Sequence, residues 1–205
     1  MPAKKKAKKK SSKKPLVSVI IAAFNAEDKI GTAIRAIVNQ SYKPLELFVV
    51  DDGSTDNTRA VVSSHAKEYK NVHLLKQNRK GPGAAKNLAF SKSKGKIIVF
   101  SDSDEYPRKK YISLLIDPII KGKAQTSAGA WYVAFPKSPW ARCRFQDSHE
   151  IRIHGVNSKV FRAIKASDFK KTGGFDPSKG YSDDRLGQNL KKAQVLEAIF
   201  DHDVE

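Results

Sequence analysis

Acidic residues directly follow two apolar runs of this chain. Asp51 and Asp52 come after LELFVV, and Asp102, Asp104 and Glu105 come after IIVF. Carboxylates held close together repel one another, and a divalent cation removes that cost. Carboxylate, phosphate and water oxygens suit Mg²⁺ and Mn²⁺, so the second cluster predicts a metal site shared with a phosphorylated ligand. The first cluster has an alternative interpretation as a capped turn, because DDGSTDNT is rich in turn and helix-capping residues.

Strand-like and helix-like segments alternate from Pro15 onward. VSVIIAA is a continuous apolar run typical of a buried parallel strand, and apolar residues then recur at helical spacing after Asn25, a plausible helix cap. This alternation predicts a doubly wound, mostly parallel α/β sheet with helices on both faces. Such sheets bind ligands outside the carboxyl ends of their strands, so we expect both acidic clusters to face one crevice. The predicted strands are 17–23, 45–50, 72–75 and 97–100, and two further helices are predicted at 56–69 and 83–93.

Length and composition indicate one soluble domain. The 205 residues suffice for a sizeable core, and the single cysteine, Cys143, can form no internal disulfide. A reducing compartment is therefore expected, which predicts the cytoplasm, including the cytoplasmic face of the membrane. No apolar run approaches the roughly 18 residues that cross a bilayer, and the start lacks the apolar segment of a signal peptide.

The first 14 residues form a separate basic segment. They contain eight of the 39 Lys and Arg residues of the chain and no acid. Such a block is typical of a solvated, disordered tail, and attraction to anionic lipid or to nucleic acid is the alternative. We therefore expect a basic tail at 1–14 and one folded domain at 15–205.

Several nucleotide-binding and metal-binding motifs are missing from the sequence. It contains no G-x-x-x-x-G-K-[ST] loop and no G-x-G-x-x-G after a strand. A calcium loop starting at Asp51 or Asp52 would need glutamate where Val62 or Ser63 stands. Phosphoaspartyl hydrolases also carry D-x-D after an apolar strand, but they usually follow it with threonine, where this chain has Glu105.

Five sequence pieces resemble one enzyme family. VSVIIAAFNAEDKI, ELFVVDDGSTDNT, GPGAAKNLAF, GKIIVFSDSDE and GGFDPSKGYSDDRLGQNL occur in the order and spacing of family 2 glycosyltransferases, over nearly all of 16–190. The resemblance implies the GT-A fold and inverting transfer of a sugar from a nucleotide diphosphate, commonly UDP. It also implies dependence on Mn²⁺ or Mg²⁺.

The resemblance also implies roles for individual residues. Asp52 would contact the nucleotide base beside its neighbour Asp51, Asp102 would approach the ribose, and Asp104 would coordinate the metal, with Asp102 beside it. The remaining matches to the nucleotide-binding motifs are Ala22, Phe24 and Glu27, which border the base and ribose, and Lys86, near the diphosphate. His202, in IFDHDVE, is either a late metal ligand or a histidine without a functional role.

A general base is needed if the acceptor is a hydroxyl group. Aligning LGQNL with the family's usual L-G-x-R-L implies that Asp183 is this base. The preceding residue is Ser182 where the family has glutamate, so the register can shift to Asp184. The expected acceptor is lipid-linked or a glycan, and the tail together with the aromatic and basic stretch 131–145 suits contact with an anionic membrane.

Two rival classes of function remain. The high net charge of +18 would suit a nucleic-acid-binding module, but no reader motif is present. A catalytically silent sugar-nucleotide-binding domain is the second rival, and the presence of Asp102, Asp104 and Asp183 argues against it.

Overall fold

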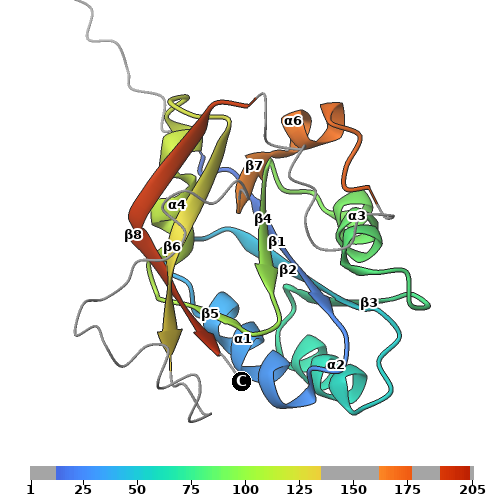
Figure 1. Ribbon diagram of the computed structural model, residues 1–205. Coiled ribbons are helices and arrows are strands. Elements are labelled where there is room, and N and C mark those ends of the chain that lie inside the picture. Colours follow the sequence, from blue (N-terminus) through green and yellow to red (C-terminus); the bar gives the residue numbers. More distant parts are fainter. Residues whose placement is uncertain (1–12, 135–161, 177–189, 204–205) are drawn as a thin grey trace, which may run out of the picture.

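The first half of the chain forms four parallel strands. The computed structural model describes residues 13–134, 162–176 and 190–203 (Figure 1). Strand β1 pairs with β2 on one side and with β4 on the other, and β2 pairs with β3, all in parallel. The predicted doubly wound α/β sheet is therefore confirmed for this half. The bounds are β1 Val17–Ala23, β2 Leu45–Asp51, β3 Val72–Lys76 and β4 Ile97–Asp102.

Four further strands extend the sheet beyond β4, and the sequence analysis did not predict them. The order of the eight strands is β3-β2-β1-β4-β7-β6-β8-β5. The pairs β4/β7, β6/β7 and β5/β8 are antiparallel, whereas β6 and β8 run parallel. The bounds are β5 Glu105–Pro107, β6 Thr126–Ala134, β7 Ala163–Lys165 and β8 Lys192–Asp203.

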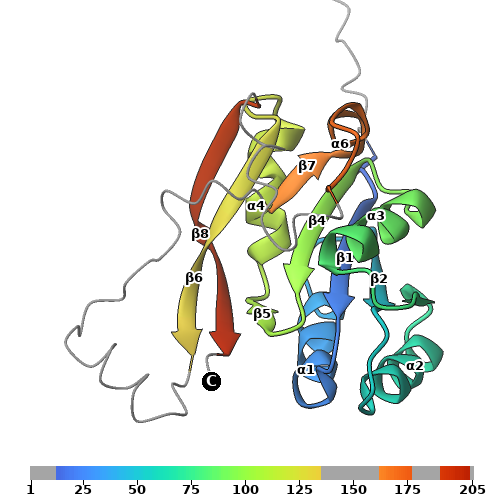
Figure 2. The ribbon, with the colours of Figure 1, turned by 45° about the vertical axis from the view of Figure 1, so that its right-hand side comes forward.

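Helices cover both faces of the sheet, as predicted (Figure 2). Alternate residues of β1 point to opposite faces: Val19 and Ile21 pack with α1, α2 and α4, whereas Ile20 packs with α3 and α6. Both sets are fully buried, which explains why the strands read as continuous apolar runs. The bounds are α1 Glu27–Val38, α2 Thr58–Glu68, α3 Pro82–Lys92, α4 Tyr111–Ile120 and α6 Ala166–Lys171.

Helix α1 begins differently from the prediction that Asn25 caps it. Its N-cap position is Ala26, whose side chain offers no acceptor, and the Ala26 N–H donates instead to Thr58 Oγ1 at 2.7 Å. Asn25 has a left-handed backbone, with a φ of 46°, and its Oδ1 accepts from Thr55 N at 2.9 Å. Asn25 therefore joins the loop after β1 to the loop after β2 rather than capping the helix.

The strand register brings the acidic clusters to one edge of the sheet. Ala23 lies beside Asp51 of β2, and Ala22 lies beside Asp102 of β4. Both clusters therefore follow the carboxyl ends of strands that flank β1, as the crevice prediction requires. Among the described residues, no helix is both long and apolar enough to span a membrane.

Candidate functional site

Asp51 holds the turn that follows β2. Its side chain is fully buried, Oδ1 accepts from Ser54 N at 3.0 Å, and Oδ2 accepts from Arg59 Nε at 2.6 Å. Burial raises the pKa of Asp51, but the hydrogen bonds from Ser54 and Arg59 outweigh burial and leave this pKa below its ordinary value. These contacts support the capped-turn interpretation of Asp51, and its role toward a nucleotide stays a prediction.

Asp52 holds the loop that leads into α3. Its Oδ1 accepts from Gln77 Nε2 at 2.7 Å and from Lys80 N at 2.8 Å, and its Oδ2 accepts from Gly81 N at 2.9 Å. The residue is 4% exposed. Gly53 follows with a φ of 78°, and a Cβ there would lie 3.0 Å from Arg79 N. A glycine is therefore required where these two loops meet.

The other residues matched to the base and ribose lie around the same loops. Phe24 is half-buried, and the guanidinium of Arg79 lies 3.2 Å from the centre of its ring. Glu27 accepts from Asn57 N at 2.7 Å through Oε2, which links the start of α1 to the loop before α2. Ala22 is half-buried beside Asp102. The fold thus gathers Ala22, Phe24, Asp51 and Asp52 at one edge, and their contact with a nucleotide stays a prediction.

Two cations hold Asp102 at the end of β4. Lys86 of α3 donates to Oδ1 at 3.0 Å, and Arg162 Nη1 donates to Oδ2 at 3.0 Å. The Lys86 side chain is 10% exposed and that of Asp102 is 28% exposed. Burial raises the pKa of Asp102, but the charges of Lys86 and Arg162 outweigh burial and hold this pKa well below its usual range. Lys86 therefore lies beside Asp102, and its predicted contact with the diphosphate stays a prediction.

Glu105 closes the turn between β4 and β5. Its Oε2 accepts from Ser101 Oγ at 3.0 Å and from Asp102 N at 3.1 Å, and its Oε1 forms an ion pair with Arg162 Nη2 at 2.5 Å. Its side chain is almost completely buried. Burial raises the pKa of Glu105 to about 7, against the opposing charge of Arg162. Asp104 lies in this turn and is half-buried.

Sequence reasoning missed Arg162, which contacts both Asp102 and Glu105. The residue directly precedes β7, and the pairing of β7 with β4 brings it to Asp102, which lies 60 positions earlier in the sequence. Burial lowers the pKa of Arg162, but the two carboxylates more than offset this effect. No spacing in the sequence indicates the contact, because it depends on the antiparallel pairing of a strand of only three residues.

His202 lies on β8, and its Cα faces Glu105 of β5 in the antiparallel register. The sheet therefore brings the two distant sequence motifs together at the backbone level. Among the described side chains, no group of three His, Cys, Asp or Glu residues is arranged to hold a metal ion. Metal coordination by Asp102, Asp104 and His202 stays a prediction.

The predicted catalytic acids, Asp183 and Asp184, lie outside the described residues. The preceding GGF segment is fixed to α3, because Asn87 Nδ2 donates to Phe175 O at 2.8 Å and Asn87 Oδ1 accepts from Phe175 N at 2.9 Å. Asn87 is the neighbour of Lys86 in the sequence. The chain thus enters its next segment from a position close to the Asp102 cluster.

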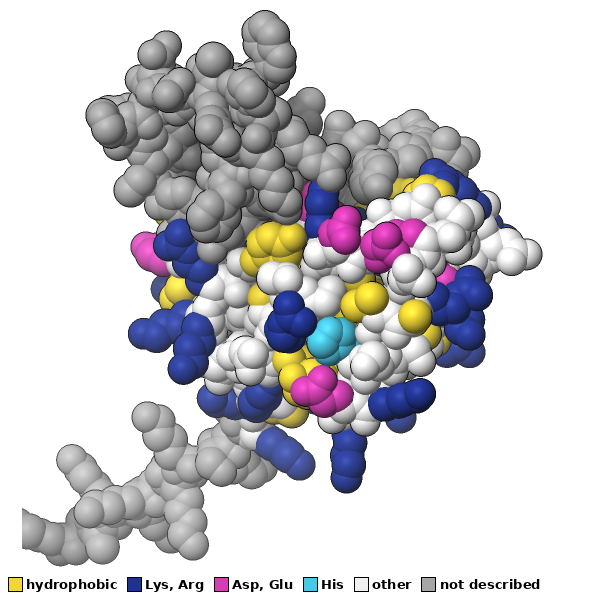
Figure 3. All heavy atoms as spheres, turned by 90° about the horizontal axis from the view of Figure 1, so that it is seen from below, with side chains coloured by type: hydrophobic (Ala, Val, Ile, Leu, Met, Phe, Trp, Pro, Cys, Tyr) yellow, Lys and Arg dark blue, Asp and Glu magenta, His cyan; other side chains and the backbone are white. Residues whose placement is uncertain are grey.

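Figure 3 shows the side of the molecule on which the parallel strands end. Among the side chains coloured in this view, Lys and Arg line the left, lower and right edges, whereas Asp and Glu are fewer. A doubly wound sheet with acids and buried cations at its carboxyl edge is typical of α/β proteins that bind phosphorylated ligands.

The chain belongs to glycosyl transferase family 2, whose family model matches residues 18–174. It is 37% identical over 91 residues to the Escherichia coli protein named UDP-Glc:alpha-D-GlcNAc-diphosphoundecaprenol beta-1,3-glucosyltransferase WfaP. That match covers 44% of this chain and 36% of the relative. The family prediction is therefore confirmed.

Solved structures confirm the GT-A fold. S. aureus TarS 1–349 in complex with UDP superposes with a TM-score of 0.72 at 18% identity, covering 92% of this chain and 60% of that chain. The mannosyltransferase PcManGT from Pyrobaculum calidifontis, in complex with GDP-Man and Mn²⁺, gives a TM-score of 0.64 at 21% identity. This second match covers 95% of this chain and 58% of that chain.

Proposed function

We propose that this chain transfers a sugar, with inversion, from a UDP-linked donor to a lipid-linked or glycan acceptor. The observation that carries the proposal is the turn after β4, where Asp102 contacts the cations Lys86 and Arg162 and Asp104 lies two residues further along the chain. Acids and cations at this edge suit a ligand that combines ribose hydroxyls with a diphosphate. Structural neighbours bind UDP and UDP-GlcNAc, which supports a UDP-linked donor.

A divalent cation fits the residues available at this turn. Asp104 supplies a carboxylate, and His202 lies on the strand that pairs with the turn. Mn²⁺ accepts oxygen and imidazole ligands together, whereas Mg²⁺ favours oxygen alone, so a role for His202 would favour Mn²⁺. When bound, the metal would stabilise the negative charge that develops on the leaving diphosphate. A neighbour of the same fold is known in complex with Mn²⁺, which supports metal use.

Lys86 would supply a second positive charge to the same diphosphate. Its ammonium group is mostly shielded from water, so its interaction with a phosphate is less screened than that of a surface lysine. It already contacts Asp102, so donor binding would bring the diphosphate against a cation that is held in place. Such preorganised charge lowers the cost of forming the transition state.

Deprotonation of a hydroxyl acceptor would be the task of Asp183, or of Asp184 in the shifted register. The anchoring of Phe175 to Asn87 supports this role, since it starts the segment containing both acids beside α3. A lipid phosphate acceptor is already ionised near neutral pH and needs no such base.

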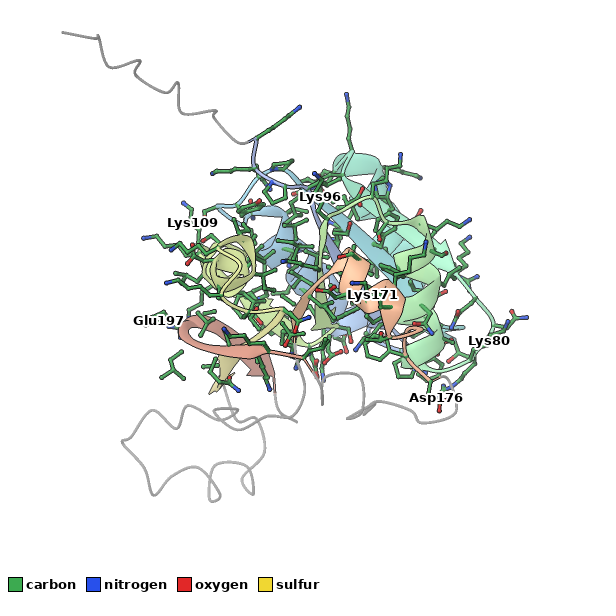
Figure 4. All side chains as sticks on the ribbon, turned by 90° about the horizontal axis from the view of Figure 1, so that it is seen from above. Lys80, Lys96, Lys109, Lys171, Asp176 and Glu197 are labelled. Carbon is green, nitrogen blue, oxygen red and sulfur yellow. The ribbon has the colours of Figure 1, made fainter. Side chains whose placement is uncertain are left out.

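Contact with an anionic membrane is part of the proposal and would involve the basic tail. Pro15 and Lys96 line an open groove of about 520 Å³ at the amino edge of the sheet, opposite the acids. Figure 4 views that side, with Lys96 and Lys171 labelled. Since this edge faces away from the donor site, the tail would act as a tether rather than as part of the acceptor site.

Calorimetric titration with UDP and with a panel of UDP-sugars, in Mn²⁺ or in EDTA, tests the donor proposal. We expect binding only in the presence of the metal, and we expect Asp104→Ala to lose more affinity than Asp102→Ala because it removes a direct metal ligand. Asp117→Ala is the control, since Asp117 pairs with Lys121 on the surface of α4. Equal affinity in Mn²⁺ and EDTA would show that the metal has no part in donor binding.

Turnover measurements with a hydroxyl acceptor test the base. Asp183→Asn should slow transfer by roughly 10²- to 10⁴-fold with donor affinity nearly unchanged. Asp184→Asn is measured in parallel because of the open register. If neither variant is slower than the unchanged protein by more than a few fold, another carboxylate is the base.

A further inference from the structure

One guanidinium group connects both ends of the turn that contains Asp104. Arg162 Nη1 contacts Asp102, and Arg162 Nη2 contacts Glu105. Asp102 ends β4 and Glu105 begins β5, so the two contacts span the whole turn. The Arg162 side chain is 21% exposed, which shields both contacts from water.

The planar geometry of arginine matters for this arrangement. The two terminal nitrogens of a guanidinium are held rigidly relative to each other, so the carboxylates that they bind are also fixed relative to each other. A lysine ammonium group at the same place would carry the charge without that constraint. Asp102 N and Ser101 Oγ fix the other oxygen of Glu105, which leaves the turn little freedom.

The charges also require a cation here. The turn contains three acids, Asp102, Asp104 and Glu105, and the structure pairs Lys86 with Asp102 and Arg162 with both Asp102 and Glu105. Arg162 is the cation paired with the buried Glu105 among the described residues, and a buried carboxylate that loses its cation is strongly unfavourable. Arg162 therefore supplies both charge and geometry to the turn.

We propose that Arg162 is a positioning residue, which fixes Asp102 and Glu105 on either side of Asp104 so that the turn presents one geometry to the diphosphate and its metal. The proposal rests on the proposed function of the site. It assigns a role in donor binding to a residue that lies outside every motif recognised above. Residues that orient metal ligands typically change metal affinity by roughly 10- to 100-fold when they are substituted.

The test compares Arg162→Lys with a control of similar structural cost. Gln40 is 2% exposed and holds the same chain segment a few residues later, since its Nε2 donates to Pro107 O at 3.0 Å and to Arg108 O at 2.9 Å. Gln40→Ala should destabilise the fold without contacting Asp102 or Glu105. Thermal unfolding of the ligand-free variants measures the structural cost, and calorimetry with UDP and Mn²⁺ measures donor binding.

We expect Arg162→Lys to weaken Mn²⁺-dependent UDP binding by roughly 10- to 100-fold. Gln40→Ala should bind UDP and Mn²⁺ nearly as well as the unchanged protein at a similar loss of thermal stability. The electron paramagnetic resonance signal of bound Mn²⁺ provides a second readout, and it should broaden in Arg162→Lys if the metal geometry is no longer unique.

Four outcomes would overturn the assignment. If Arg162→Lys binds UDP as tightly as the unchanged protein, the positioning role is refuted and the proposed function is not. The same holds if Gln40→Ala loses as much UDP affinity as Arg162→Lys. If the unchanged protein shows no Mn²⁺-dependent UDP binding, the proposed function fails and the assignment fails with it.

Should Arg162→Lys not fold, Glu105→Gln replaces it, because it keeps the shape of the turn and removes one charge that holds Arg162. Unchanged affinity in that variant would also refute the role.

Discussion

Replacing Lys86 with methionine would separate the structural and functional roles of the cation beside Asp102. The substitution removes the charge and keeps a long apolar side chain. Lys86 Nζ lies 3.0 Å from Asp102 Oδ1, and both side chains are less than a third exposed. A hydrogen bond between charged groups contributes about 1.5 to 3 kcal/mol. Because Asp102 keeps its contact with Arg162, we expect the lower part of that range, about 1.5 to 2 kcal/mol.

This loss corresponds to a measurable change in melting temperature. For a chain of this size, 1 kcal/mol shifts the melting temperature by about 2 to 4 °C, so Lys86→Met should melt about 3 to 8 °C lower. The double variant Lys86→Met/Asp102→Asn removes both charges of the pair. It should regain part of this stability, because no uncompensated carboxylate remains at the end of β4.

Donor affinity should behave differently from stability in the same series. If Lys86 contacts the diphosphate, calorimetry will show weakened UDP binding in the single variant, and the double variant will not recover it. Lys121→Met is the control, since the exposed Lys121–Asp117 pair should contribute at most about 1 kcal/mol. Full recovery of UDP affinity in the double variant would mean that Lys86 serves only to neutralise Asp102, and the reasoning would be wrong.

Three further predictions concern the loops and the tail. Gly174→Ala should destabilise the fold by about 1 to 3 kcal/mol, because Gly174 has a positive φ. The loss should exceed that of Gly173→Ala, because of these two glycines only Gly174 would place a Cβ 2.7 Å from Asn87 Oδ1. Chemical unfolding measures both variants. Asp51 has a lower pKa in the folded protein than in the unfolded chain, where it is near 3.9, so its carboxylate contributes stability above that pH and loses it as the pH falls through the folded pKa. Asp51→Asn should therefore reduce the loss of stability below about pH 4. Unfolding measured between pH 7 and pH 2 checks this. Deleting 1–14 should reduce co-sedimentation with anionic vesicles at low salt and leave UDP binding unchanged, and equal sedimentation would mean that the tail only aids solubility.

The parallel half of the fold follows from local sequence. Strands β1, β2 and β4 are buried on both faces, so they appear as uninterrupted apolar runs, and their bounds match the predicted ones within two residues. Parallel strands share one carboxyl edge, which is why the sequence alone predicts that the strand-end acids face a common crevice. Periodicity and topology rules were sufficient for this part.

The other half could not be derived in this way. Strands β5 and β7 have three residues each, too few for a periodic pattern, and they are defined by their partners in the sheet. The contact of Arg162 with Asp102 and Glu105 depends on that pairing, so it was invisible in the sequence. The start of helix α1 shows the same limit locally, since the N–H groups of Ala26 and Glu27 donate to Thr58, at the start of α2, and to Asp56, just before it, and not to a cap of the helix's own.

The buried cations also change the reason for expecting a metal. In the sequence, the crowding of Asp102, Asp104 and Glu105 suggested that a divalent ion relieves their repulsion. In the structure, Lys86 and Arg162 are already paired with Asp102 and Glu105, which weakens the attraction of this turn for a divalent ion. The charge that needs compensation would instead arrive with the diphosphate of the donor.

We therefore expect Mn²⁺ to bind weakly to the protein alone and much more tightly when UDP is bound. By linkage, Mn²⁺ should tighten UDP binding by the same factor. Titrating Mn²⁺ with and without UDP, followed by paramagnetic resonance, measures that factor. Equal Mn²⁺ affinity in both titrations would show that the acids alone hold the metal and that Arg162 and Lys86 do not offset their charge.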